Sequence, residues 1–124
     1  MKDNEIKVVI VKPHEPAYEA VIKNDLYELQ QIVGGWIEIT YPFDEDVCVI
    51  GNDEAKLIGM EGTLSINDSI YCGPVIIVGD DYENGVFKSL TDEQIKFYTD
   101  MFSIPENIDQ AAIEADMGYT IWSW

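Results

Sequence analysis

The sequence predicts an α+β domain in which about three helices pack on a mostly antiparallel sheet. Its 124 residues suffice for one hydrophobic core but not for two, so we expect residues 1–124 to form a single domain. Short runs rich in β-branched residues, separated by Gly, Pro, Asn and Asp, are typical of strands joined by turns. Helical spacing of apolar residues occurs once early and twice at the end, which does not fit a regular alternation of strand and helix.

The N-terminal third predicts a hairpin and a helix. Residues 5–12 (EIKVVIVK) and 18–23 (YEAVIK) are expected strands, joined by a stiff Pro-containing loop. Asn24 is the expected N-cap of a helix that carries apolar residues at helical spacing, and acids in its first turn favour that position. The helix is expected to end at Gly34–Gly35, with one glycine in the left-handed conformation.

The middle of the chain predicts the rest of the sheet. WIEITYP and DVCVIGN are expected strands, and AKLIGM and TLSI are expected short strands or a hairpin around Glu61–Gly62. The most apolar run, Ile70–Gly79, is the expected central strand, and Pro74 marks a bulge or break in it. Asn84–Gly85 is the signature of a two-residue hairpin turn.

Two helices are expected to follow the sheet. Thr91 and Gln94 form a capping-box pattern before DEQIKFYTDMF. Pro105 is expected to open a last helix, which Gly118 closes. Trp122 and Trp124 in the aromatic tail belong to the core if buried and are interface anchors if exposed.

The charge balance excludes several partners. Twenty-four acids face seven lysines and no arginine, giving a net charge of −17. Because nucleic-acid and anionic-membrane binding both depend on Lys and Arg, we expect neither. No apolar run reaches the length of a membrane span or of a secretory signal, so a cytoplasmic protein is expected.

The acids fall in clusters at predicted turns and helix starts. Taken singly, each cluster is explained as solvated residues that favour such positions. A folded chain of this mass exposes roughly 6,700 Å², so evenly spread acids would each occupy about 280 Å². That density of negative charge is too low to imitate duplex DNA, which carries a charge every ~1.7 Å of its axis. A binding role therefore requires the acids to gather on one face. The candidate partner-binding residues are Asp44, Glu45, Asp46, Asp53, Glu54, Asp80, Asp81 and Glu83.

No pattern indicates catalysis, a metal or a cofactor. His14 lies in a loop without a nucleophile or an orienting partner in sequence. Cys48 and Cys72 lie in apolar runs without CxxC spacing and are expected to be buried thiols. The loop from Asp80 lacks the EF-hand pattern, because Tyr82 stands at its third position and Thr91 at its twelfth. We therefore expect a protein that is not an enzyme.

The first predicted hairpin holds a large share of the positive charge, with Lys7, Lys12, Lys23 and His14 in or near it. Lysines that guard an edge strand explain this pattern. The alternative is a pocket for a small anionic ligand, and its candidate residues are Lys7, Lys12, His14, Tyr18 and Trp36.

Taken together, IKVVIVKP, DLYELQQIVGGWIE, NDEAKL, GPVIIVGDD and FKSLTDEQI resemble the domain-of-unknown-function family 3846, short proteins of phages, plasmids and conjugative elements. The resemblance covers about residues 5–100, and the C-terminal helix and tail, 104–124, fall outside it. At His14 the family more commonly has glycine. The resemblance implies an accessory protein of a mobile element and supplies no catalytic residues.

Two functions follow as expectations. The first is a binding protein that counters host defence or regulation by sequestering a host factor through an acidic surface. The alternative is a homo-oligomeric sponge for a small nucleotide immune signal of the cyclic or ADP-ribose type. The missing arginine weighs against the sponge, although an oligomer concentrates lysines.

Overall fold

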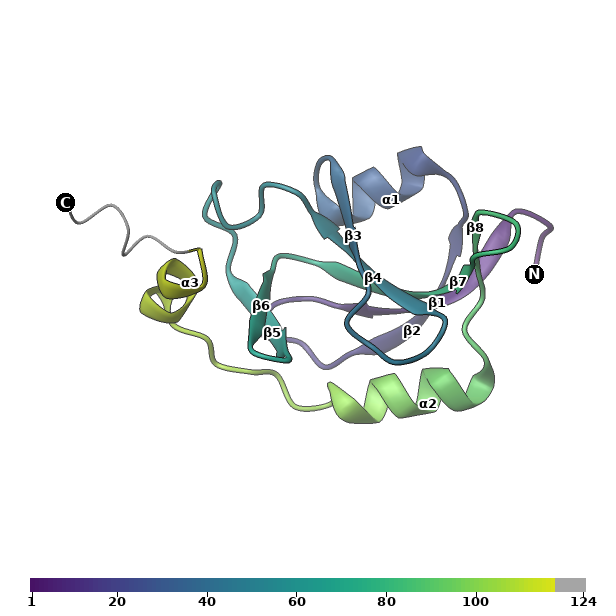
Figure 1. Ribbon diagram of the computed structural model, residues 1–124. Coiled ribbons are helices and arrows are strands. Elements are labelled where there is room, and N and C mark those ends of the chain that lie inside the picture. The colour runs from purple at the N-terminus through teal and green to yellow at the C-terminus, as the bar shows by residue number, and fades with distance from the viewer. Residues whose placement is uncertain (118–124) are drawn as a thin grey trace.

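A computed structural model describes residues 1–117 and confirms the α+β class (Figure 1). The elements, in chain order, are β1 (Glu5–Val11), β2 (Tyr18–Lys23), α1 (Leu26–Val33), β3 (Ile37–Thr40), β4 (Val47–Asn52), β5 (Gly62–Ile66), β6 (Ser69–Cys72), β7 (Val75–Asp81), β8 (Val86–Lys88), α2 (Asp92–Met101) and α3 (Gln110–Asp116).

The main sheet is antiparallel, and its strand order is β2-β1-β7-β4-β3. β7 is the central strand, as predicted, because it pairs with β1 through residues 75–77 and with β4 through residues 76–79. β8 pairs with the last three residues of β7, beyond the segment that β1 uses. β5 and β6 form a separate two-stranded hairpin.

The two faces of the sheet are covered by different helices, as Figure 1 shows, with α1 on one face and α2 on the other. Alternate residues of β7 therefore enter different cores: Ile76 and Val78 pack with α1, and Val75 and Ile77 with α2. Burial on both faces explains why the strand reads as a continuous apolar run. A third, small cluster joins α3 to Ala55 and Cys72 through Ile113.

The first helix confirms the predicted stop and corrects the predicted start. Gly34 has φ +84 and is the left-handed C-cap. The N-cap is Asp25, not Asn24, because the extended backbone of Asp25 lets its carboxylate accept the Glu28 N–H at 2.8 Å. The Asn24 amide instead donates to the Phe87 carbonyl at 3.0 Å and ties the helix start to β8.

The predicted strand over AKLIGM is wrong. Residues 53–59 form turns, in which the Ile58 N–H donates to the Glu54 carbonyl and Gly59 takes φ +81. The hairpin in this region turns at Asn67–Asp68 rather than at Glu61–Gly62, since both of these residues have positive φ. The predicted break at Pro74 is confirmed, because it separates β6 from β7.

The hairpin at Asn84–Gly85 is confirmed, but the turn has four residues instead of two, because Asp81 pairs with Val86. Asp81 accepts both the backbone and the side-chain N–H of Asn84, which stabilises the longer turn. These hydrogen bonds, led by the one from the Asn84 side chain, also lower the pKa of Asp81 below its ordinary value.

The capping box of α2 is confirmed, with Thr91 and Gln94 bonded reciprocally. The last helix begins at Gln110, capped by Asp109, and not at Pro105. The Glu106 carboxylate accepts the backbone N–H and the hydroxyl of Ser65, which holds the connection against β5. Gly118, Trp122 and Trp124 lie outside the described residues.

Gly79 is required where β7 meets β8. A Cβ there would lie 2.8 Å from the Lys88 carbonyl oxygen and 3.0 Å from that of Ser89, whereas a Cβ on Gly51 would lie 3.7 Å from its nearest neighbour, Val75 Cγ1. We expect Gly79→Ala to lower the free energy of unfolding by about 1–3 kcal/mol through backbone displacement. Gly51→Ala is the matched control, expected within about 0.5 kcal/mol of wild type in urea unfolding. Equal effects of the two substitutions would contradict the close approach.

Candidate functional site

The fold brings two of the acidic clusters together at one end of the sheet. β4 begins beside the end of β7, and the Asp80 N–H donates to the Asp46 carbonyl at 2.9 Å. The turn at 44–46 and the turn after β7 are therefore spatial neighbours, although more than thirty residues separate them in the chain.

A third cluster, Asp92–Glu93, joins them through Glu45. Its carboxylate accepts the Gln94 amide at 2.7 Å and also the Tyr98 hydroxyl. Glu45 is therefore fixed against the first turns of α2, and it is more than the solvated turn residue that its position in the sequence predicts.

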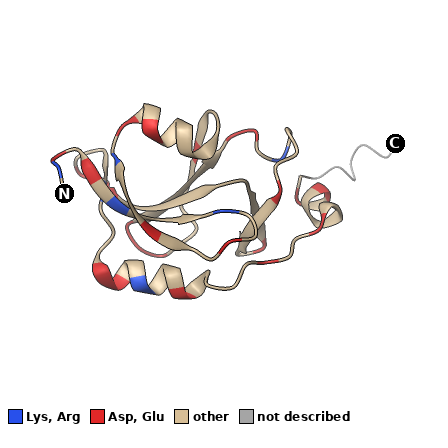
Figure 2. Cartoon of the chain, turned by 180° about the vertical axis from the view of Figure 1, so that it is seen from behind, with Lys and Arg blue, Asp and Glu red and all other residues tan. Residues whose placement is uncertain are grey.

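We call residues 44–46, 80–83 and 92–93 the acidic end. Figure 2 shows that α1 and α2 both start at this end of the molecule, so the acids of their first turns add to it. Lys7 offsets part of this charge, since its Nζ lies 3.9 Å from Asp92 Oδ1. The remaining predicted acids, Asp53 and Glu54, are exposed after the far end of β4 and do not belong to the acidic end.

A groove of about 480 Å³ enters the acidic end on the α1 face of the sheet. We call it the Asp80 groove. The start of α1, the end of β3 and the β7–β8 hairpin form its walls, and Asp80 lies among the lining residues. The apolar and aromatic side chains along it include Leu26, Leu29, Ile39, Tyr41, Tyr82 and Val86.

Asp80 is the unusual residue of this groove, because only 7% of it is exposed. Its Oδ2 atom has no hydrogen-bond partner among residues 1–117. Burial and then the Asp80 carboxylate raise the pKa of the Cys48 thiol to about 12. The same two causes, in the same order, raise the pKa of Tyr41 and of Tyr82.

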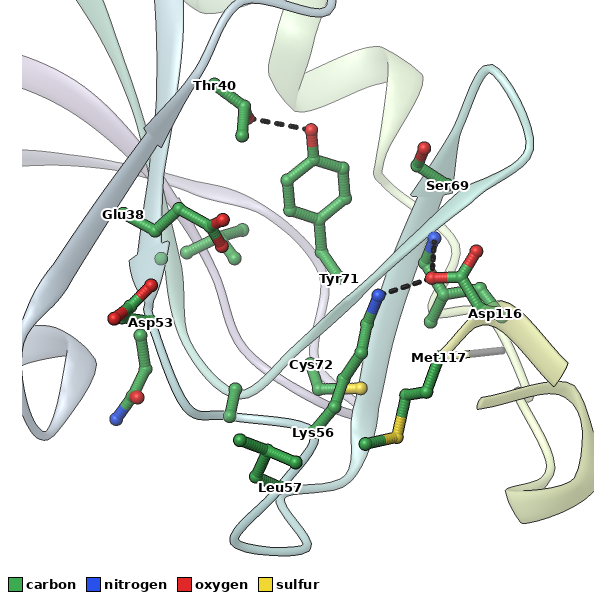
Figure 3. Close-up of a pocket in the computed structure, with 15 residues that line it drawn as sticks. Glu38, Thr40, Asp53, Lys56, Leu57, Ser69, Tyr71, Cys72, Asp116 and Met117 are labelled. Carbon is green, nitrogen blue, oxygen red and sulfur yellow. Dashed lines mark hydrogen bonds and ion pairs between the residues drawn. The ribbon is translucent and has the colours of Figure 1, made fainter. Parts of the chain in front are cut away.

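A second hollow, of about 510 Å³, lies between the β3–β4 edge of the sheet and the β5–β6 hairpin (Figure 3). Glu38 and Asp53 stand on one wall, and Lys56 and Asp116 stand on the other. The Lys56 ammonium pairs with the Asp116 carboxylate, which also accepts the Ile70 N–H at 3.3 Å. This pocket is net acidic, and its one lysine is already paired.

The five residues proposed for an anionic ligand do not share a cavity. Lys12 lies over the Tyr18 ring at 5.7 Å from its centroid, beside the β1–β2 edge. Lys7 points to the face of the sheet that α2 covers, because its neighbours Ile6 and Val8 point to the face that α1 covers. Trp36 is 69% exposed and precedes β3, at the opposite edge.

His14 pairs with Glu61, and its φ of +63 explains a sequence feature. That left-handed conformation favours glycine, the residue that the family resemblance leads us to expect at this position. The structure thus gives His14 an acidic partner, Glu61, that the sequence did not reveal.

Within residues 1–117, no group of three or more His, Cys, Asp or Glu side chains is arranged to hold a metal ion. No helix in that range is long and apolar enough to cross a membrane. Cys48 and Cys72 are free thiols, and both are buried as predicted.

A family model described as Domain of unknown function (DUF3846) matches residues 6–103. The chain belongs to this family. No curated protein and no solved structure shows significant similarity to it. The DUF3846 match runs from β1 to the end of α2, which confirms the predicted resemblance. It includes the whole acidic end and the Asp80 groove, whereas the pocket of Figure 3 also uses Asp116 from α3, outside the match.

Sequence reasoning grouped Asp80 with the exposed acids and missed its burial. The signal lay in the period of two along β7, because Asp80 follows Ile76 and Val78 on the α1 face. Continuing that alternation past Gly79 places Asp80 under the helix and Asp81 on the opposite face.

Proposed function

We propose that this protein is a non-catalytic binding protein of a phage or mobile element, which acts in the cytoplasm of a bacterial host. It sequesters a basic host defence or regulatory factor through the acidic end. The observation that carries the proposal is the gathering of three acidic clusters from distant parts of the chain, through the bonds of Asp46 to Asp80 and of Glu45 to α2.

Electrostatics supports a basic partner over an anionic one. The chain carries 24 acids, and ion pairs engage Lys7, Lys56 and Lys96, three of its seven lysines. A negative end of this kind attracts a positive, nucleic-acid-binding surface during diffusional encounter and repels phosphates. The small nucleotide sponge has weaker support, because its five candidate residues lie on different faces and edges of one chain; only an oligomer could bring them together.

The test is salt-dependent capture of the partner. The tagged protein is purified from its bacterial host, a co-purifying basic protein is identified, and association is measured in rising salt. We expect the association rate to fall about tenfold between low and physiological ionic strength, because screening weakens steering.

Two triple variants localise the effect. Asp44→Asn, Asp46→Asn and Glu83→Gln together remove three charges from the acidic end and should slow association at low salt. Asp53→Asn, Glu54→Gln and Glu114→Gln remove the same charge from exposed positions elsewhere and should not. Binding that is insensitive to salt and to the first variant would refute the proposal. A nucleotide mass retained in native mass spectrometry would support the sponge instead.

A further inference from the structure

Asp80 is held in place by the sheet, whereas one of its carboxylate oxygens has no partner in the described chain. The residue belongs to β7, its N–H is bonded to Asp46, and its side chain is nine-tenths buried on the α1 face. Oδ2 accepts no hydrogen bond from residues 1–117. Buried polar atoms are normally paired, and such an exception calls for a physical explanation.

The side chains that line the groove offer Asp80 no cationic donor. The Tyr82 hydroxyl is near enough for the Asp80 carboxylate, after burial, to raise the pKa of Tyr82, but a phenol is neutral. The Asn24 amide is committed to the Phe87 carbonyl, and Asp25 is committed to the Glu28 N–H as the helix cap. None of the seven lysines lines the groove. Residues 1–117 therefore supply no cationic donor for the Asp80 carboxylate.

The walls of the groove suit a flat cation on an apolar stem. The rings of Tyr41 and Tyr82 stack with centroids 5.9 Å apart and an interplanar angle of 27°, and both residues are more than half exposed. Ile39 and Val86 extend the apolar surface towards solvent. A guanidinium stacks on aromatic rings and is weakly hydrated, whereas an ammonium is compact and strongly hydrated.

We infer that the Asp80 groove is the anchor site for an arginine side chain of the basic partner. The guanidinium donates to the Asp80 carboxylate and lies against the Tyr41–Tyr82 pair, while its methylene stem covers Ile39 and Val86. The inference rests on the proposed function and names the residue that the acidic end recognises. Central, desolvated arginines are among the side chains that most often dominate interface energetics.

The test uses a small probe and needs no partner. The 15N-labelled protein is titrated with N-acetyl-arginine methylamide, and NMR chemical shifts are followed at constant ionic strength. We expect saturable shifts confined to the β7–β8 hairpin, the end of β3 and the start of α1. N-acetyl-lysine methylamide should bind at least threefold more weakly, because its ammonium stacks less well.

Variants assign the contacts. Asp80→Asn should weaken binding of the arginine probe about tenfold or more, since it removes the charged acceptor. Glu114→Gln is the control, because it removes an exposed carboxylate from α3, which does not line the groove, and it should change binding less than twofold. Tyr82→Leu should weaken binding about threefold through loss of the aromatic face. If the Asp80 variant fails to fold, the Tyr82→Leu variant still tests the site, because Tyr82 is 62% exposed and its replacement should leave the fold intact.

The outcomes separate this inference from the proposed function. Shifts of equal size in wild type and in either groove variant, or shifts spread over the whole acidic surface, would overturn the anchor site. Salt-sensitive capture of a basic protein could still hold in that case. Groove-specific probe binding without any captured partner would support the arginine site and leave the sequestering function refuted. Equal affinity for the lysine probe would overturn the choice of arginine.

Discussion

Tyr98→Ala is expected to lower the free energy of unfolding by about 3–5 kcal/mol, the range for deleting a large aromatic side chain from a core. Tyr98 is completely buried in the core between the sheet and α2. Its ring lies 4.7 Å from that of Phe43, measured between centroids, and its hydroxyl donates to Glu45. The substitution therefore opens a cavity and also removes one of the two hydrogen bonds that hold Glu45 against α2.

Two milder variants separate these contributions in urea unfolding. Tyr98→Phe keeps the ring and loses only the hydroxyl bond, at a cost of about 1–2 kcal/mol. Phe97→Ala removes the adjacent ring, which is 55% exposed, and should cost about 1 kcal/mol. If Tyr98→Ala cost no more than Phe97→Ala, the packing described for α2 would be wrong.

Tyr98 also gives stability a dependence on alkaline pH. Burial, followed by the hydrogen bond to Glu45, raises the pKa of Tyr98 well above its ordinary value. The unfolded chain loses this proton near pH 10 and the folded chain keeps it to higher pH. The contribution of the Tyr98 hydroxyl to the free energy of unfolding is therefore complete below pH 10 and declines above it. In urea unfolding at rising pH, Tyr98→Phe should lack this decline.

Cys48 is expected to resist thiol reagents almost completely while the protein is folded. The residue has no exposed surface, and its pKa rises from the ordinary 9.0 to about 12. The fraction present as the reactive thiolate therefore falls on the order of 10³-fold, before any steric protection is counted.

The measurement is labelling by a disulfide reagent at pH 8 in Cys72→Ala protein, where Cys48 is the one thiol left. We expect labelling that is at least 10³-fold slower than that of the same variant in urea, where the burial is lost. Rapid stoichiometric labelling without denaturant would contradict the position of Cys48 on β4, in the core between the sheet and α1. It would also show that the Asp80 side of the core opens readily.

Local signals predicted the elements well wherever the decisive interaction is itself local. The capping box at Thr91, the left-handed Gly34 and the break at Pro74 depend on residues only a few positions apart. The errors occurred where distant contacts decide the outcome. Pro105 does not start a helix because Glu106 is bonded to Ser65, a residue 41 positions away.

The candidate site was harder to predict, because its geometry is created by strand order. Sequence identified the acids as candidates for binding but could not show that β4 and β7 would be neighbours. It also treated Asp80 and Asp81 alike, although the alternation of the strand places one against the core and the other in the turn bond to Asn84. The lysine pocket was proposed from proximity along the chain, which the sheet does not preserve between Lys7, Lys12 and Trp36.

The central position of β7 has a consequence for the order in which this chain folds. The β1–β2 and β3–β4 pairs are complete early in synthesis, but each presents an unpaired apolar edge until residues 75–81 arrive between them. Neither helix-covered core can close before that insertion, so folding depends on contacts between residues far apart in sequence and should be slow. A nascent chain that stalls before residue 75 would expose two unpaired strand edges, on β1 and on β4, that can pair with other chains. Prompt completion of translation therefore helps to keep this protein from aggregating.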